Sequence, residues 1–537
     1  MKEVRLKEIR LGHLHQRKML NSQFTSGQQC HLGAALTILL AAAVLYANGR
    51  ERQGLIMLTL AALLLRSFAI LLDPYLNFWD EVYHAVVGSN MAHHPFTPRL
   101  HTVDAMPTGT NWMNTGIWLH KPPFFLWQIA LSVASFGAES WAVRVPSALW
   151  TAALVPVTYR IAVLVTGDRK TAFMAATGMA CSFYLQEITS GALNTDHNDA
   201  VFVSIVVFSW WALLEHLVNG SRRWALLAGL FSAAAVLTKW YVGLSVFLPW
   251  SLILVLDRSR SRSAVNLFMA LGVLVLVVGA WIARMFWLSP EQAMYEWGFK
   301  TSHLTSTIAA HAGSWSYHLD IIQKLLRPWS TFLVVLAFAW LVIKVRSAPR
   351  IFIVSIALGI HLLFGFAQTK MPSYTMVLLP IYIIALAHML ICLLSLLPKR
   401  IGQLPLPLAF AGLLFGVSML AIQRTHDLHT LAVPLRTDQD PRRAQLAMFA
   451  AQTKLLTLLN DTHPKVIFNI PAPHDLQFMF RSGYDSMDGI PTQDQANRLQ
   501  ASGYEVIVVD HGAFNSEMPQ GVRIISAERL GMPRPTH

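Results

Sequence analysis

The chain has 537 residues, of which 54% are hydrophobic and only 13% are charged. Soluble globular domains carry about 25% charged residues, so this composition excludes a soluble protein and predicts a polytopic membrane protein. The net charge of +13 is typical of basic cytoplasmic loops and does not indicate a nucleic-acid partner. The cysteines Cys30, Cys181 and Cys392 have no CxxC spacing, so neither a disulfide framework nor a zinc site is predicted.

Apolar runs follow a polar and basic N-terminal tail, 1–31, in which we expect no cleavable signal peptide. The runs predict a mainly α-helical membrane bundle of about 11–13 transmembrane helices, although several runs are shorter than the ~20 residues of a straight span. The predicted membrane segments are 32–47, 54–72, 141–166, 171–189, 199–217, 224–238, 241–256, 264–287, 330–343, 350–366, 374–397 and 404–422.

The basic loops orient this bundle, because positively charged loops stay in the cytoplasm. They share one side of the membrane if 73–140 does not cross it, and its apolar run "PPFFLWQIALSVASFG" suits a re-entrant or interfacial segment. If the run 32–47 crosses the membrane, the basic tail 1–31 lies outside the cytoplasm, against the rule for positively charged segments. Either 32–47 is not a full span, or the tail is an exception to this rule. The basic loops are 48–53, 167–170, 220–224, 257–263, 344–350 and 398–400.

The composition changes after the membrane region. "KVIFNI" and "YEVIVVD" predict buried strands, and "TQDQANRLQASG" predicts a helix that ends at a glycine. We therefore expect a small α/β domain of about 110 residues, 425–537, outside the cytoplasm. The transmembrane domain would then be 32–424, with large outer loops at 73–140 and 288–329.

Charged residues gather in the outer turns that this topology predicts. Asp80 and Glu81 directly follow a predicted span, where charge is costly and is either functional or a solvated helix cap. Lys121 precedes Pro122, which holds it in extended geometry at the start of a helix. A lysine placed there can bind phosphate, or it can simply reach toward lipid headgroups.

Three further outer turns add to this set. Asp196 lies in "NTDHNDAVF", Lys239 lies between two short apolar runs, and Lys370 and Tyr374 lie in "TKMPSYTMVLLP". Any one of these charged residues could occur in a turn by chance. Chance is a weaker explanation for several lysines and acids that converge on one face of the bundle. Lysines suit a phosphate group and carboxylates suit general-base work, which predicts group transfer from a lipid-linked phosphate donor.

The same stretches resemble a known family, the bacterial lipid A aminoarabinose transferases and the protein O-mannosyltransferase-like group (glycosyltransferase families 39 and 83). These are integral-membrane glycosyltransferases of the GT-C fold. The resemblance runs from about Leu71 to Leu386, and each motif is weak singly while their order is specific. The motifs are "WDEVYHAV", "HKPPFFLW", "AVRVPSALW", "NTDHNDAVF", "AVLTKWYVG" and "TKMPSYTMVLLP".

The resemblance implies an inverting transfer from a polyprenyl-phosphate sugar to a lipid, protein or glycan acceptor, on the outer face of the bacterial inner membrane. It implies an acceptor-activating or positioning role for Asp80, a supporting role for Glu81 and a second acid at Asp196. It implies that Lys121 meets the donor phosphate. The late loop that closes over this phosphate would contribute Lys370 and Tyr374, with Lys239 a weaker member of the same cluster.

The chain departs from the family pattern at several points. Val86 and Val87 stand where a second glutamate often follows, and Trp240 and Tyr241 replace the Gly-Pro of the lysine turn. The first outer loop carries an extra "HTVDAMPTGTNWMNTGIW" that could alter the acceptor. No metal-ligand spacing such as HExxH is present, so no cofactor is assigned, although a divalent ion beside Asp80 or Glu81 stays open because some GT-C relatives bind one.

Two other classes compete with an enzyme. A lipid-linked sugar transporter or flippase shares many helices, but it typically shows inverted repeats and broken helices with charge at mid-membrane. The sequence shows neither, and its charges lie in the turns of one face. A structural or assembly subunit would leave the clustered lysines and acids unexplained. The sequence names neither the sugar nor the acceptor.

Overall fold

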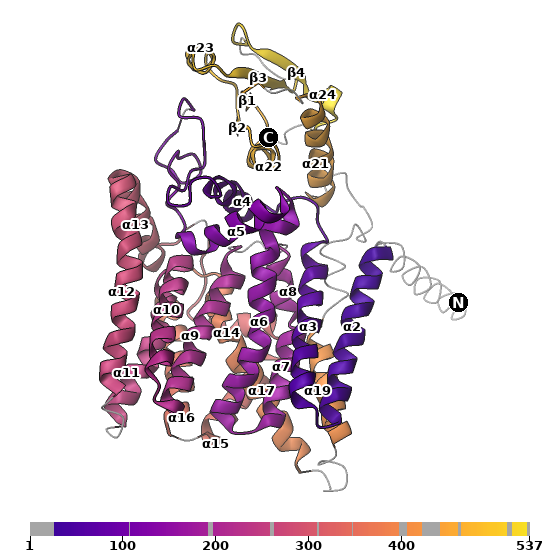
Figure 1. Ribbon diagram of the computed structural model, residues 1–537, viewed down its shortest axis with the longest axis vertical. Helices are drawn as coiled ribbons and strands as arrows, with labels where there is room; N and C mark the ends of the chain where they lie inside the picture. Colours follow the sequence, from indigo (N-terminus) through magenta and orange to yellow (C-terminus); the bar gives the residue numbers. More distant parts are fainter. Residues whose placement is uncertain are drawn as a thin grey trace, which may run out of the picture.

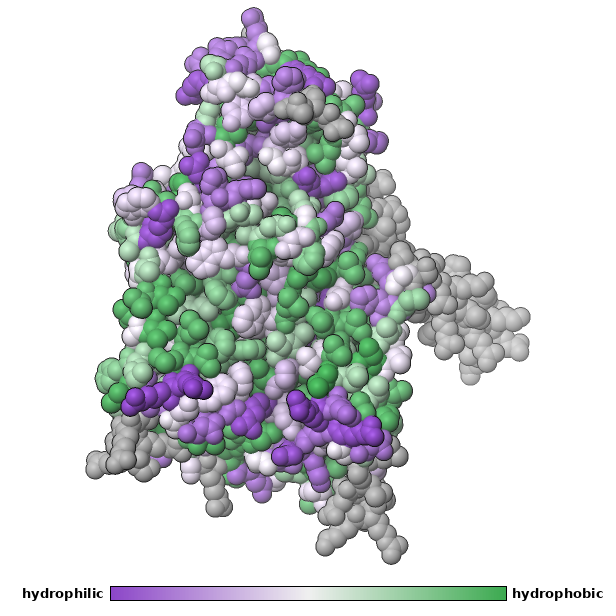
Figure 2. Space-filling view, in the orientation of Figure 1, coloured by the Kyte–Doolittle hydropathy of each residue, from purple (hydrophilic) through white to green (hydrophobic). Residues whose placement is uncertain are grey.

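The computed structural model describes residues 26–106, 108–191, 197–257, 263–308, 311–345, 347–396, 405–420, 441–459, 463–512 and 518–533. Most of these residues form one bundle of helices, and a small sheet stands on one end of it (Figure 1). We call that end of the bundle the sheet end. A band of hydrophobic side chains surrounds the middle of the visible face, with hydrophilic side chains above and below it (Figure 2).

Seven helical segments in the described residues are long and apolar enough to cross a membrane. This finding agrees with the predicted polytopic membrane protein, because a straight span needs about 20 residues. Helix α2 has 22 residues, so the first apolar run is long enough to cross. The seven segments are α2 (Ser26–Ala47), α3 (Glu51–Ile70), α6 (Ser140–Thr166), α9 (Asp199–Asn219), α12 (Ser263–Leu288), α16 (Ser347–Phe366) and the pair η3 (Pro372–Leu378) and α17 (Leu379–Leu394).

Shorter helices complete the bundle and its sheet end. The predicted run 171–189 is divided at Ser182 into two helices. The apolar run did not predict this break, because hydrophobicity indicates burial and not the direction of the chain. Helix α5 has only 14 residues, in keeping with the prediction that 73–140 does not cross. These helices are α4 (Asp80–Met91), α5 (Pro123–Phe136), α7 (Arg169–Cys181), α8 (Phe183–Thr189), α10 (Arg222–Lys239), η1 (Tyr241–Val246), α11 (Phe247–Leu256), α13 (Pro290–Thr305), α14 (Tyr317–Leu325), α15 (Thr331–Lys344) and α19 (Pro405–Met419).

The C-terminal residues form a parallel sheet with strand order β2-β1-β3-β4 in the described part. Strands β1 and β3 are the two predicted strands, and their continuous apolar runs are typical of parallel strands covered on both faces. The predicted helix is α23, which begins with a capping box between Thr492 and Gln495. The elements are α21 (Pro441–Leu458), β1 (Lys465–Phe468), α22 (His474–Ser482), β2 (Asp485–Met487), α23 (Gln493–Ala501), β3 (Glu505–Asp510), β4 (Arg523–Ser526) and α24 (Ala527–Leu530).

The C-terminal sheet unit, 441–533, is packed against the bundle and not merely tethered to it. Helix α22 lies against α4, and Leu476, Met479 and Phe480 join the hydrophobic core of the bundle. The ring of Phe78 meets that of His474 edge to face at 4.9 Å. Apolar burial of this kind fixes the unit directly above α4, the helix that begins with Asp80.

Candidate functional site

A cavity of about 750 Å³ opens at the sheet end of the bundle. Its volume is in the range of small-molecule binding sites. The first outer loop, the start of α9, the turn after α10, helix α13 and the loop between α16 and η3 all contribute to its wall. The charged and histidine side chains in that wall are Asp80, His120, Lys121, Asp199, Lys239, Lys300, His303 and His311.

Asp80 and Lys121 form the first ion pair in this wall. The Nζ atom of Lys121 lies 3.5 Å from Oδ1 of Asp80, and both side chains are largely shielded from solvent. The sequence positions them by two helix starts, because α4 begins at Asp80 and α5 begins at Pro123. Pro122 has an extended backbone and Pro123 is the first residue of α5. The two prolines therefore restrict the backbone directly after Lys121, and with it the direction of the Lys121 side chain.

Asp199 and Lys239 form a second pair across the cavity wall. Asp199 begins α9, Lys239 ends α10, and their side chains are joined by a salt bridge. Trp240 follows with a φ of 64°, a left-handed conformation that glycine adopts more easily. The turn after Lys239 therefore has a geometry that suits a glycine, even though a tryptophan stands where the family has Gly-Pro.

The late loop brings Tyr374 into the cavity and keeps Lys370 behind its wall. Tyr374 lines the cavity, stacks on Phe364 at 4.4 Å, and lies 6.0 Å from the Nζ of Lys239. The buried ammonium of Lys370 donates to the carbonyl oxygens of Phe364 at 2.7 Å and Gly365 at 2.6 Å. In this structure Lys370 thus holds the loop to the end of α16, although its neighbours Thr369 and Met371 line the cavity.

Glu81 faces away from the cavity and into the protein. Its carboxylate binds Arg144 through Oε1 and Nε at 2.6 Å and through Oε2 and Nη2 at 3.0 Å, and it accepts from the Asn77 N–H at 2.6 Å. Burial alone would raise the pKa of Glu81, but Arg144 and His197 outweigh it and hold the pKa below its usual range. Glu81 therefore supports the helix that carries Asp80. The other predicted acid, Asp196, lies outside the described residues.

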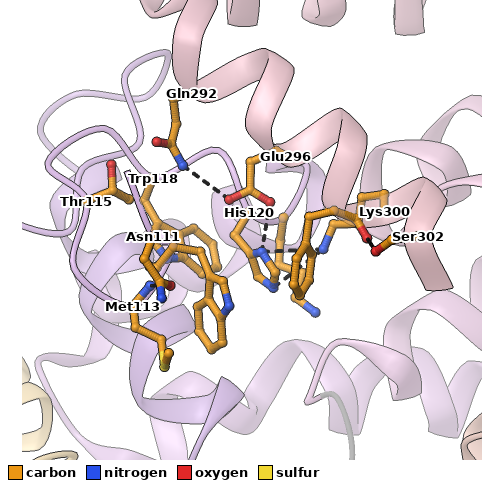
Figure 3. Close-up of polar contacts among 12 residues, drawn as sticks. Asn111, Met113, Thr115, Trp118, His120, Gln292, Glu296, Lys300 and Ser302 are labelled. Carbon is orange, nitrogen blue, oxygen red and sulfur yellow. Dashed lines mark hydrogen bonds and ion pairs between the residues drawn. The ribbon is translucent and has the colours of Figure 1, made fainter. Parts of the chain in front are cut away.

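A third polar cluster was not predicted as a site. The imidazole Nδ1 of His120 lies 2.9 Å from Oε2 of Glu296, and Lys300 Nζ lies 3.4 Å from its Nε2 (Figure 3). Gln292 donates to the other oxygen of Glu296 at 3.2 Å. Burial raises the pKa of Glu296 against the opposing effect of Lys300 and Lys121. The available signal was the spacing of Glu296 and Lys300, which places both on one face of a helix.

The described residues hold no group of three or more histidine, cysteine, aspartate or glutamate side chains that could bind a metal ion. What they do hold is a pattern of paired charges around the cavity. Lys121 pairs with Asp80, Lys239 pairs with Asp199, and Lys300 approaches His120, which is itself bound to Glu296. Such a cavity suits an anionic group that can compete with the carboxylates for the lysines.

Comparison with known proteins gives matches in sequence and in fold. The family described as dolichyl-phosphate-mannose-protein mannosyltransferase matches residues 120–283. Undecaprenyl phosphate-alpha-4-amino-4-deoxy-L-arabinose arabinosyl transferase 2 of Pseudomonas fluorescens is 27% identical over 59% of this chain and 59% of its own length. The corresponding transferase of Pseudomonas aeruginosa is 29% identical over 53% of each chain. The chain therefore spans less than two thirds of the length of these relatives.

The fold is that of a solved membrane protein. The crystal structure of ArnT from Cupriavidus metallidurans bound to undecaprenyl phosphate aligns with a TM-score of 0.59 and 16% identity, over 84% of this chain and 89% of that one. The apo structure of the same protein aligns with a TM-score of 0.58. These matches confirm the predicted fold class, a GT-C helix bundle with a small C-terminal sheet, and the predicted resemblance to ArnT-like transferases.

Proposed function

We propose that the chain, which has the ArnT fold, is a glycosyltransferase that moves a sugar from a polyprenyl-phosphate donor to an acceptor, with inversion at the anomeric carbon. The observation that carries the proposal is the cavity at the sheet end, where Lys121 and Lys239 lie beside Asp80 and Asp199. The related transferases are named for an undecaprenyl-phosphate sugar, and the solved ArnT structure contains undecaprenyl phosphate.

The donor phosphate would lie between Lys121 and Lys239, with Tyr374 beside it. A phosphate leaves as a stabilised anion, so fixed positive charge lowers the barrier more than a strong acid would. Lys121 precedes helix α5 and Lys239 ends helix α10. The polyprenyl chain can stay among apolar side chains of the same cavity, such as Val242, Leu363 and Phe364. Lys370 would act indirectly, by holding the loop that carries Tyr374.

Asp80 would act on the acceptor beside the bound donor. Its ion pair with Lys121 places the Asp80 carboxylate next to the proposed phosphate site. A phosphate that draws Lys121 toward itself would leave a carboxylate oxygen to accept a hydrogen bond from the acceptor. The acceptor oxygen then attacks the anomeric carbon and gives its proton to Asp80, while the sugar–phosphate bond breaks and its electron pair leaves with the phosphate that the lysines hold. Attack from the face opposite the phosphate gives inversion. Asp196 would supply a second acid.

Several finer points belong to the same proposal. The names of the relatives favour a pentose, although the mannosyltransferase family match leaves a hexose open. The acceptor would be lipid A, a protein or another glycan. We place the enzyme in the bacterial inner membrane with the cavity and residues 425–537 outside the cytoplasm. The basic loop 48–53 lies at the end of the bundle opposite the C-terminal sheet unit (Figure 1), as the positive-inside rule requires.

The test is a transfer assay followed by mass spectrometry. Purified protein in detergent is mixed with a panel of polyprenyl-phosphate sugars, and donor consumption is followed with a membrane extract as acceptor. We expect one donor to be consumed, and Asp80→Asn to slow its consumption by at least about 100-fold while the protein stays folded. If well-folded protein consumes none of the donors and instead moves a lipid-linked sugar across vesicles, the chain is a flippase and the proposal is wrong.

A further inference from the structure

The first outer loop folds back on itself beside the cavity. Arg99 and Ile117 form an antiparallel bridge, Leu100 N–H donates to Gly116 O at 3.1 Å, and Trp118 N–H donates to Pro98 O at 2.9 Å. These bonds join the two ends of the segment 101–118, the stretch that we predict from the sequence to be extra relative to the family pattern. The described middle of this segment therefore projects from a closed base, and its position depends on what it contacts.

One of those contacts is a buried carboxylate of the C-terminal sheet unit. Asp485 Oδ2 accepts hydrogen bonds from Val103 N–H at 2.6 Å, from Thr102 N–H at 2.9 Å and from Thr102 Oγ1 at 3.1 Å. His101 Nδ1 lies 3.4 Å from Oδ1. Burying a carboxylate is costly unless it is fully hydrogen-bonded, so this arrangement is specific for one placement of the segment.

Apolar contacts hold the segment to the same unit. Val103 and Met106 are buried in a cluster with Phe468 and Val508, which share one face of the C-terminal sheet, and with Leu499 of helix α23. The anchor thus combines a charged hydrogen-bond acceptor with two inserted hydrophobic side chains. Asp485 begins β2, a strand of only three residues, so the sheet places this carboxylate directly at the segment.

A second part of the segment, between its two joined ends, reaches the cavity. Asn111, Trp112 and Met113 line it. Trp112 stacks on the imidazole of His120 at 4.4 Å with an interplanar angle of 14°, and its carbonyl accepts from the Trp118 indole N–H at 3.0 Å. Figure 3 shows Asn111 and Met113 on one side of His120 and Lys300 on the other. The segment therefore connects the buried carboxylate of one unit to the cavity wall of the other.

We propose that the segment 101–118 is the wall that contacts the acceptor, and that Asp485 is the positioning residue that sets this wall in place. The proposal rests on the proposed function. The polyprenyl chain of the donor must leave toward the bilayer, while this wall lies between the cavity and the C-terminal sheet unit. An indole beside a side-chain amide is suited to a sugar ring, since one packs against the ring and the other binds hydroxyls.

The test compares Asp485→Asn with Asp510→Asn as a matched control. Asp510 also lies at the end of a strand in the C-terminal sheet unit, but its carboxylate accepts from Gly512 N–H within its own turn. The probes are purified lipid A and a short neutral oligosaccharide as acceptors, and undecaprenyl phosphate for donor-site binding. We expect Asp485→Asn to raise the acceptor KM about tenfold or more, with undecaprenyl phosphate affinity unchanged, and Asp510→Asn to match the parent chain.

A double-variant cycle separates positioning from a general loss of stability. If Asp485 acts through the wall, adding Asp485→Asn to Trp112→Ala raises the acceptor KM no further than Trp112→Ala alone. Additive effects, or an acceptor KM that Asp485→Asn leaves unchanged, would overturn the proposal. Thr102→Val, which removes a single hydrogen bond to Asp485, gives a milder variant if Asp485→Asn does not fold.

Hydrogen exchange tests the placement of the wall without any turnover. Peptides that cover 108–118 should exchange faster in Asp485→Asn than in the parent chain, while those from α13 should not change. Unchanged exchange in 108–118 would refute the positioning role whether or not the chain transfers a sugar. An inactive parent chain with the expected exchange pattern would instead count against the proposed function and leave the placement of the wall supported.

Discussion

Replacing Glu81 by alanine should destabilise the protein strongly, because it leaves Arg144 buried without its counter-charge. The Arg144 side chain is fully buried, and Glu81 supplies two of its bonds, at 2.6 and 3.0 Å. Its other hydrogen bonds in the described residues go to the carbonyl oxygens of Ile70, Asp73 and Tyr75. Breaking a buried ion pair by removing one partner costs about 3–5 kcal/mol, so we expect a loss of that size in the unfolding free energy of Glu81→Ala.

The assay is unfolding of the purified protein in mixed micelles of increasing denaturing-detergent content, with turnover measured per folded molecule. Glu81→Gln retains an acceptor but no charge, so its loss should be smaller, about 1–3 kcal/mol. The double variant Glu81→Leu with Arg144→Met should regain most of the lost stability, since apolar groups can replace a buried pair. If Glu81→Gln has the stability of the parent chain but no activity, Glu81 is a catalytic group and the structural role is wrong.

Three further predictions follow from individual side chains. Lys121→Ala should weaken binding of undecaprenyl phosphate about 10- to 100-fold, the effect of one lost charged hydrogen bond, and calorimetry that shows unchanged affinity would remove its phosphate role. Lys370→Met should weaken the same binding less than Lys121→Ala, because Lys370 bonds loop carbonyls; an equal or larger loss would make it a phosphate ligand. Burial raises the pKa of Asp475 from 3.8 to about 7, so its contribution to stability is complete below about pH 4 and is lost as the pH rises through 7. Asp475→Asn should therefore be more stable than the parent chain at pH 8 and equal to it at pH 4, whereas parallel stability curves would contradict the buried, protonated state.

The bundle was predictable because its signal is local. The apolar run 141–166 corresponds to helix α6 (Ser140–Thr166), and "KVIFNI" and "YEVIVVD" contain β1 and β3. Strands β2 and β4 were not predicted, because β2 ("DSM") has one apolar residue and β4 ("RIIS") has two, too few for an apolar run or an alternation. Likewise, nothing in composition marks the break at Ser182 inside a continuous apolar stretch.

The candidate site was predictable only where the chain itself marks it. Prolines and helix starts indicated Asp80 and Lys121, and the structure places Lys121 Nζ 3.5 Å from Asp80 Oδ1. The pairing of His120 with Glu296 joins residues 176 positions apart, and that of Thr102 with Asp485 joins residues 383 apart. Partners at such separations are set by packing of whole elements, for which a single sequence has no local signal. The directions in which the Lys370 and Glu81 side chains point also depend on the packing of whole elements, so the sequence did not predict them.

The proposed function requires that a sugar is transferred from a polyprenyl-phosphate donor in the cavity at the sheet end, with Asp80 serving the acceptor and Lys121 the donor. The most direct measurement is donor consumption and product mass for the parent chain and for folded Asp80→Asn, with binding of undecaprenyl phosphate measured in parallel. We expect one donor to be consumed, a product heavier by one sugar residue, and an Asp80→Asn variant that still binds the lipid phosphate but turns over at least about 100-fold more slowly. Normal turnover by a folded Asp80→Asn variant would contradict the proposed function.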